Sequence, residues 1–196
     1  MEVEEGGLLL YSKEHSRLSK VCGVEISNTA IEFFARKGIG IFKTLDMCAG
    51  RKFDLITAID VIEHVPHPKE FLLSLRDRLN TGGKVFLRLP VIDGMLFDRK
   101  RPEEWKWVYA PYHVSMFSIK ALKQLCAATG FNCHIVMDKE VHAHFGHFLM
   151  RFIPRYERIP LILIRLLRVP YLLFVPILRR IWPSECVYAT LEPIDR

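Results

Sequence analysis

The feature that most constrains the fold of this chain is the pattern of residues 53–90. An apolar run rich in β-formers, FDLITAI, leads to Asp60 and predicts a fully buried parallel strand with an acid at its carboxyl end. Apolar residues then recur at three- and four-residue steps up to Leu79, which predicts a helix that ends at Gly82-Gly83. Residues 84–89 predict a second buried strand. A right-handed crossover of this kind places the loop after the first strand over the carboxyl edge of a parallel sheet, where open α/β folds bind ligands.

Two parts of this stretch resemble a known family. Residues 60–65, DVIEHV, are followed by the glycine pair in LNTGGKVFLRLP, and the combination is more specific than either part alone. The sequence resembles the class I S-adenosylmethionine-dependent methyltransferases, of the broad type that includes the quinone-biosynthesis methyltransferases. The resemblance extends over residues 18–138 and resumes in the last strand. It implies a Rossmann-like α/β fold, S-adenosylmethionine as the cofactor and methyl transfer as the activity.

Glu25 ends a predicted strand at residues 21–25. In a nucleoside-binding α/β unit, a carboxylate at the end of the second strand accepts hydrogen bonds from both ribose hydroxyls. Together with the family resemblance, this position predicts that Glu25 binds the ribose of the cofactor. The alternative is a solvated carboxylate before a helix that Ser27 or Asn28 would cap.

Asp46 and Met47 follow a predicted strand at residues 39–45. The resemblance implies that the adenine is held here. An ionised Asp accepts from an amino group, and a thioether is a polarisable partner for an aromatic face. The alternative is a surface turn, because Asp and a nearby glycine are common turn residues. The resemblance also implies that Ile59 and Asp60 line the methionine part of the cofactor.

The chain departs from the family pattern at its beginning. The family opens with a central strand and a G-x-G-x-G turn, whose glycines let the backbone approach the methionine part of the cofactor. Here the counterpart is Gly6-Gly7, and Gly7 is the residue that we assign to the cofactor site. We therefore expect the fold to lack its first strand, which would expose two strand edges. The glutamates at positions 2, 4 and 5 would also repel the carboxylate of the cofactor.

Two histidines are the candidate catalytic residues. His64 follows Glu63, and a histidine beside a carboxylate can act as a general base near neutral pH. The alternative is that the pair caps the next helix and holds the loop. His113 follows an aromatic-rich stretch, residues 93–111, that predicts a loop forming a substrate wall or lid. His113 would face the substrate there, or it would be a structural histidine that bonds the loop.

The cysteines and the remaining histidines predict no metal site. The five cysteines are odd in number and form no C-x-x-C pair, which predicts reduced thiols in a cytoplasmic protein. No signal peptide is expected, because acidic residues stand where a basic n-region would be required. His142, His144 and His147 have a spacing that fits neither one helix face nor the usual zinc patterns.

The net charge of +6 is concentrated in residues 141–183, which hold seven arginines and one glutamate. Arginines and prolines keep every apolar run there below the ~18 residues that a membrane-spanning helix needs. Arg151, Arg155, Arg158 and Arg165 fall on one side of a helix, among many leucines and isoleucines. We predict an amphipathic insertion that lies on an anionic membrane surface. The alternative is a helical cap or a homodimer surface.

These patterns predict an α/β domain over residues 1–140, the insertion at residues 141–183, and a final strand of the α/β domain within residues 184–196. The predicted function is methyl transfer to an oxygen, carbon or nitrogen nucleophile of a small, apolar or lipid-linked acceptor at the membrane. A base is needed only if that nucleophile must lose a proton. The alternative is a non-catalytic remnant of a methyltransferase that binds a membrane or a partner. Because the charge is local, nucleic acid is not an expected partner.

Overall fold

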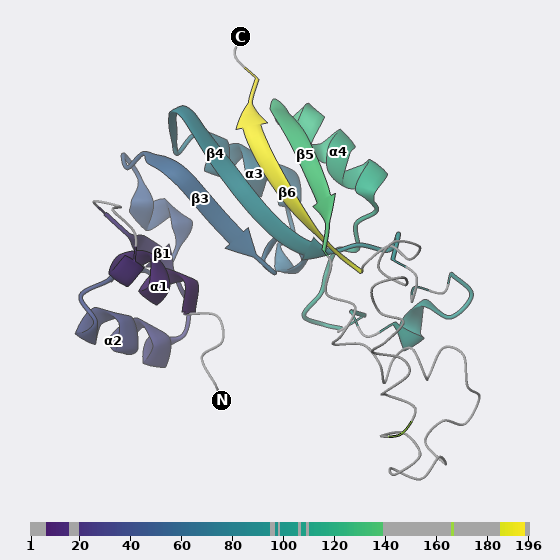
Figure 1. Cartoon of the computed structure of the whole chain (residues 1–196), viewed down its shortest axis with the longest axis horizontal. Coiled ribbons are helices and arrows are strands. Elements are labelled where there is room, and N and C mark those ends of the chain that lie inside the picture. Colours follow the sequence, from purple (N-terminus) through teal and green to yellow (C-terminus); the bar gives the residue numbers. More distant parts are fainter. Residues whose placement is uncertain are drawn as a thin grey trace. The chain divides into compact units, whose positions relative to one another are not determined.

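The computed structural model describes residues 7–15, 20–94, 97, 99–105, 107–108, 110–138, 166 and 185–194. The chain divides into two compact units, Met1–Lys52 and Phe53–Arg196, and each is described here by itself. Figure 1 shows the helices and strands of both units. The predicted insertion at residues 141–183 lies outside the described residues, apart from Leu166. In the part of the chain that is described, no helix is long and apolar enough to cross a membrane.

The first unit is a small parallel α/β unit. The two strands pair from Cys22 with Gly40 to Val24 with Phe42. This pairing confirms both predicted strands, although each is shorter than its apolar run. In chain order the elements are α1 (Gly7–His15), β1 (Cys22–Val24), α2 (Asn28–Arg36), β2 (Gly40–Phe42) and the 3-10 helix η2 (Leu45–Cys48).

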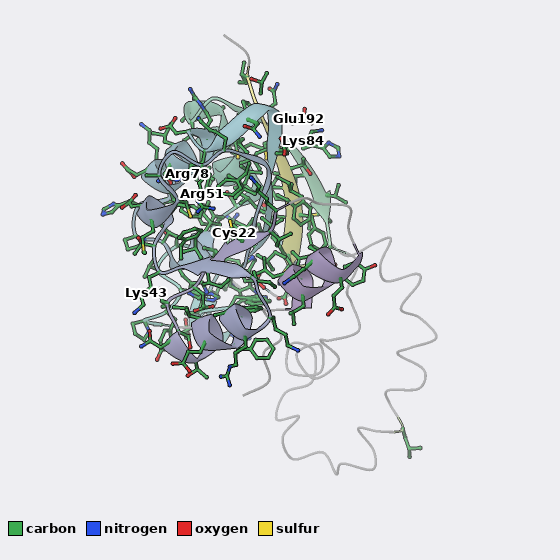
Figure 2. The ribbon with its side chains drawn as sticks, turned by 90° about the vertical axis from the view of Figure 1, so that its left-hand side faces the viewer. Cys22, Lys43, Arg51, Arg78, Lys84 and Glu192 are labelled. Carbon is green, nitrogen blue, oxygen red and sulfur yellow. The ribbon has the colours of Figure 1, made fainter. Side chains whose placement is uncertain are left out.

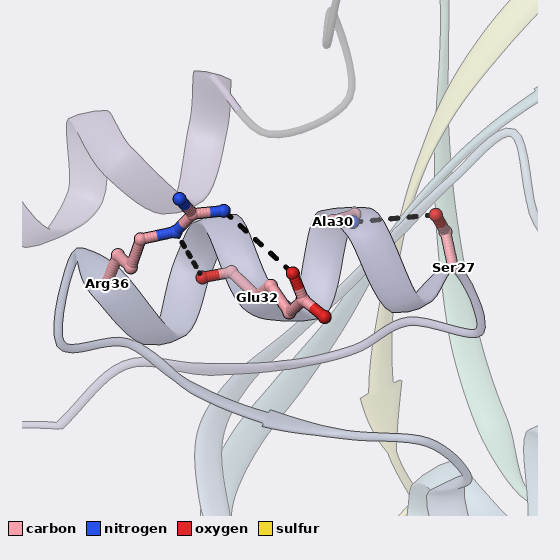
Figure 3. Close-up of polar contacts among 4 residues, drawn as sticks. All are labelled: Ser27, Ala30, Glu32 and Arg36. Atoms are coloured by element: carbon pink, nitrogen blue, oxygen red, sulfur yellow. Dashed lines mark hydrogen bonds and ion pairs between the residues drawn. The ribbon is translucent and has the colours of Figure 1, made fainter.

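Helix α2 begins where the sequence predicts. Ser27 is its N-cap, and the serine Oγ accepts a hydrogen bond from the Ala30 N–H at 3.5 Å (Figure 3). Near the other end, the Arg36 guanidinium lies 3.9 Å from the Glu32 carboxylate, and both side chains are largely exposed. The helix buries Phe34 on its inner face. Ser27 therefore fixes the start of the helix, and Phe34 anchors the helix to the core.

The second unit contains a four-stranded mixed sheet in the order β3-β4-β6-β5 (Figure 1). β3 and β4 are parallel, whereas β6 is antiparallel to both of its neighbours. The predicted final strand is confirmed as β6, which inserts between β4 and β5. The elements are β3 (Phe53–Ile59), the 3-10 helix η3 (Ile62–His64), α3 (Pro68–Arg76), β4 (Leu79–Pro90), the 3-10 helix η4 (Pro102–Glu104), α4 (Ile119–Ala128), β5 (Phe131–Met137) and β6 (Cys186–Pro193).

The core of this unit lies between the two central strands and the helices α3 and α4, which Figure 1 shows behind the sheet. Inward side chains alternate along β4 and β6, as the pleat requires. At the exposed start of this strand pair, Lys84 Nζ lies 2.6 Å from Glu192 Oε1 (Figure 2). The fully buried core residues include Leu72, Val85, Leu87, Leu89, Leu122, Cys126, Val187, Ala189 and Leu191.

Two predictions about the crossover are wrong. Helix α3 ends at Arg76, and Leu79 is the first residue of β4, where it pairs with Phe53. The glycines do not end the helix. They lie in an irregular part of β4, because Phe53 pairs with Leu79 while Leu55 pairs with Lys84. β3 is also not fully buried, since it is the edge strand of this sheet and Leu55 is 55% exposed.

The irregular start of β4 predicts different costs for its two glycines. A Cβ at Gly83 would lie 2.8 Å from Phe53 O and 2.9 Å from Asn80 O, and backbone atoms cannot move aside cheaply. We expect Gly83→Ala to lower the free energy of unfolding by roughly 1–3 kcal/mol. Gly82→Asn is the matched control, because Gly82 has φ +75° with open space around it and Asn tolerates that conformation. Urea unfolding measures both, and equal stability of Gly83→Ala and the parent would contradict this packing.

Candidate active site

Glu25 lies directly after β1, at the carboxyl end of the parallel pair in the first unit. Its N–H donates to Phe42 O at 2.9 Å, which continues the ladder with β2. Its side chain folds back, so that Oε1 accepts a hydrogen bond from the Ser27 N–H at 2.8 Å. The carboxylate is therefore held at the strand end by the main chain, and Ser27 caps α2 as the alternative predicts.

Asp46 and Met47 lie in η2, the short helix that follows β2. Because β1 and β2 are parallel neighbours, both residues follow the same strand edge as Glu25. Both are exposed, Met47 to 58%, as is the neighbouring Ile26 to 85%. Carboxylate acceptors beside exposed apolar side chains suit a nucleoside, whose hydroxyl and amino groups are donors and whose base is flat. The first unit thus fits the adenosine part of the implied cofactor.

Gly7 is the first residue of α1, and residues 1–6 lie outside the described part of the chain. Its assignment to the cofactor site stays a prediction. In the second unit, Ile59 is the last residue of β3 and is 41% exposed. Its assignment is likewise untested by any bound group.

Asp60 follows β3 in a left-handed conformation with φ 51°, which few residues other than glycine adopt. Its N–H donates to Arg88 O at 2.9 Å, and its carboxylate forms an ion pair with the Arg88 guanidinium. The same guanidinium lies 3.9 Å from Asp138, just past β5. Arg88 thereby joins the ends of β3 and β5 to the carboxyl end of β4. Asp60 Oδ1 is buried and has no hydrogen-bond partner among the described residues.

Glu63 is the most unusual residue of the second unit. It lies in η3 and is fully buried, yet neither of its carboxyl oxygens has a hydrogen-bond partner in the described part of the chain. Burial raises the pKa of Glu63 to about 7, and the charge of Asp60 adds to the rise, while the polar backbone of Glu63 itself, outside hydrogen-bond geometry, and the charges of His64 and Arg88 oppose it. A buried carboxyl without a partner costs stability, so its position indicates a functional role.

His64 and His113 meet beside this carboxyl. Their ring centroids lie 4.5 Å apart with an interplanar angle of 85°. Each Nδ1 lies against a backbone carbonyl, His64 at 2.9 Å from Tyr112 O and His113 at 2.7 Å from Trp107 O. The Trp107 ring also stacks on His113 at 6.1 Å. Burial lowers the pKa of His113, and the neighbouring His64 adds to this effect.

This arrangement decides part of what the sequence left open. One alternative for Glu63 and His64 was that they hold their loop in place. Glu63 O does so through its main chain, because it accepts the N–H groups of Val114 and Ser115 at 2.9 and 3.0 Å. The capping alternative is wrong: His67 is the N-cap of α3 and makes no side-chain cap hydrogen bond. The sequence analysis did not identify Arg88 as the ion-pair partner of Asp60. The available signal was that Arg88 is the one charged residue in the apolar run VFLRLP.

The family model of the methyltransferase domain matches residues 5–135, about two thirds of the sequence. The chain belongs to the methyltransferase domain family. No curated protein matches it. This family confirms the predicted class I S-adenosylmethionine-dependent methyltransferase, with S-adenosylmethionine as its cofactor. The narrower quinone-biosynthesis subtype stays a prediction.

Solved structures share the fold of this methyltransferase at low sequence identity. A S-adenosylmethionine-dependent methyltransferase from Thermotoga maritima is 17% identical with a TM-score of 0.53, and the match covers 87% of this chain and 72% of that one. The plantazolicin methyltransferase BamL, solved with S-adenosylhomocysteine, is 13% identical with a TM-score of 0.61 over 97% and 74%. A mycolic acid cyclopropane synthase, also solved with S-adenosylhomocysteine, gives 13% and 0.61 over 95% and 73%. These matches confirm the Rossmann-like fold class.

Proposed function

We propose that this methyltransferase modifies a small apolar or lipid-linked acceptor, and that it does so at a membrane surface. The observation that carries the acceptor class is an apolar surface beside the histidine pair. Tyr112, Val114 and Met116 alternate along the segment that carries His113, and they are 61%, 53% and 51% exposed. Three large apolar side chains exposed in a row are uncommon on a soluble surface and favour an apolar ligand.

The acceptor would lie against this surface with its nucleophile at the histidine pair. A neutral imidazole whose Nδ1–H donates to a carbonyl carries its lone pair on Nε2. The Nε2 atoms of His64 and His113 are therefore the basic atoms that face an acceptor, and they would orient it and take its proton where the nucleophile has one to lose. The exposed apolar side chains would exclude water from the acceptor.

Each unit offers its own candidate contacts to the cofactor. Glu25 would accept from the ribose hydroxyls, and Asp46 with Met47 would hold the adenine. Gly7, Ile59 and Asp60 would line the methionine part, where the unpartnered Asp60 Oδ1 can accept from the amino group. When bound, S-adenosylmethionine supplies a methyl group on a positively charged sulfur.

A second candidate function is a non-catalytic module that binds a membrane or a partner. One observation favours it: among the described strands, β3 pairs only with β4. A free strand edge is a surface on which another chain can add a strand. Cofactor binding separates the two functions, because a module without catalysis has no need of the cofactor.

The first test is titration calorimetry with S-adenosylhomocysteine. Glu25→Ala removes both acceptor oxygens and leaves ribose donors unpaired, so we expect binding to weaken by roughly 1–3 kcal/mol, or about 5- to 150-fold. Glu32→Ala is the matched control, since Glu32 is an exposed glutamate on α2 whose recorded ion pair is with Arg36 (Figure 3). Equal affinities of Glu25→Ala and the parent would remove Glu25 from the site. A parent that binds no S-adenosylhomocysteine would support the non-catalytic module.

The second test addresses the membrane part of the proposal, which rests on the arginines of residues 141–183. Arginines among apolar side chains bind anionic lipid through burial and through about 1 kcal/mol per basic residue, and salt screens the second contribution. We expect the parent chain to co-sediment with anionic vesicles, less so at high salt. Replacing Arg151, Arg155, Arg158 and Arg165 with Gln should reduce this binding far more than binding to neutral vesicles. A parent that stays in the supernatant at low salt, and elutes as a stable dimer, would make the segment a protein interface.

A further inference from the structure

Glu63, His64 and His113 form a cluster of three metal-ligating side chains in the second unit. One ligand atom from each lies within 4.8 Å of the other two. A cation bound at about 2.1 Å from each ligand needs these atoms about 3–4 Å apart, so small side-chain rotations complete the site. His113 comes from a segment far along the chain, which is why the spacing of residues gave no sign of this cluster.

The Nδ1 atom of each histidine contacts a backbone carbonyl, as is common for the ring nitrogen that does not bind the metal. A backbone carbonyl can only accept, so each Nδ1 in contact with one is the protonated nitrogen. This leaves both Nε2 atoms with a lone pair for a cation. Metal-binding histidines commonly donate the other ring N–H to a carbonyl, which fixes the tautomer and the ring orientation.

The carboxyl of Glu63 supplies the second, independent observation. It is fully buried, and both of its oxygens lack a hydrogen-bond partner among the described residues. Buried polar groups in native proteins are nearly always satisfied, and an orphaned pair of oxygens indicates an absent ligand. A cation between Glu63 and the two imidazoles would satisfy the carboxylate without moving the backbone.

We propose that Glu63, His64 and His113 bind a divalent cation of the zinc class. Two histidines and one glutamate are a ligand set of catalytic zinc sites, which keep a position open for an oxygen ligand. Since His64 is exposed and Glu63 is buried, the open position faces the surface. The ligand there is a hydroxyl, and its identity as the methyl acceptor rests on the proposed function. With both Nε2 atoms bound to the cation, the hydroxyl proton leaves to water and not to a histidine, the oxygen lone pair forms the bond to the methyl carbon, and the carbon–sulfur electron pair returns to sulfur.

Titration of the metal-free full chain with Co²⁺ tests the site without any activity measurement. We expect a visible ligand-field band without a thiolate charge-transfer band, which separates this site from the five free cysteines, and Zn²⁺ should displace the Co²⁺. Glu63→Gln and His113→Ala should each weaken Co²⁺ binding by about 100-fold or more. Glu63→Gln is nearly isosteric, and circular dichroism verifies that both variants are folded.

Two control variants keep the test specific. His67→Ala removes an exposed histidine of the same loop that is outside the cluster, and the triple variant His142→Ala, His144→Ala, His147→Ala removes the closely spaced histidines of the sequence. Both should bind Co²⁺ like the parent. The proposal is overturned if the parent binds no Co²⁺, if the spectrum is that of thiolate ligation, or if Glu63→Gln and His113→Ala bind as tightly as the parent. S-adenosylhomocysteine binding in the same samples reports separately on the proposed function.

Discussion

The ion pair between Asp60 and Arg88 is the interaction on which the second unit of this methyltransferase depends. Arg88 is a charged residue near the carboxyl end of β4, between two fully buried leucines, and a charge in such a strand is tolerated only when it is paired. It bonds to the residue after β3 and reaches the residue after β5. The pair also holds Asp60 in its left-handed conformation, and this turn directs the chain into η3. The position of Glu63 and His64 therefore follows from a charge pair inside the sheet.

Main-chain hydrogen bonds complete the site from a distant part of the sequence. Glu63 O binds two successive N–H groups, and the histidine rings bind the carbonyls of Tyr112 and Trp107. Backbone groups thus hold the two segments together. The family supplies methyl transfer as the chemistry, and this cluster is the one that we propose acts on the acceptor.

The sequence predicted the elements whose signals are local. Ser27 caps α2, and the apolar runs mark β3 and β4. The same local reasoning failed at Leu79. This residue continues the three- and four-residue spacing of the apolar residues of the helix, although it begins the irregular first part of β4. It also placed His64 and His113 separately and missed Arg88, since these contacts depend on tertiary pairing that no periodicity encodes. Residues 141–183, except Leu166, lie outside the described part, so the predicted insertion stays a prediction.

The fold buries the Glu63 carboxyl without a hydrogen-bond partner among the described residues. The unfolding free energy of the parent and of Glu63→Gln, measured from pH 4 to 8 with a chelator present, tests it most directly. Because the folded pKa of about 7 lies above the ordinary value of 4.5, the contribution of Glu63 to stability is fully present below pH 4.5, and roughly 3 kcal/mol is lost as the pH rises through 7. Asp60, His64, His113 and Arg88 are the charged or titratable groups around Glu63 and are unchanged in the variant. We therefore expect Glu63→Gln to match the parent near pH 4.5 and to exceed it by roughly 3 kcal/mol at pH 8. A variant that is less stable than the parent at pH 8 would show that the carboxylate has a stabilising protein partner and would contradict the account.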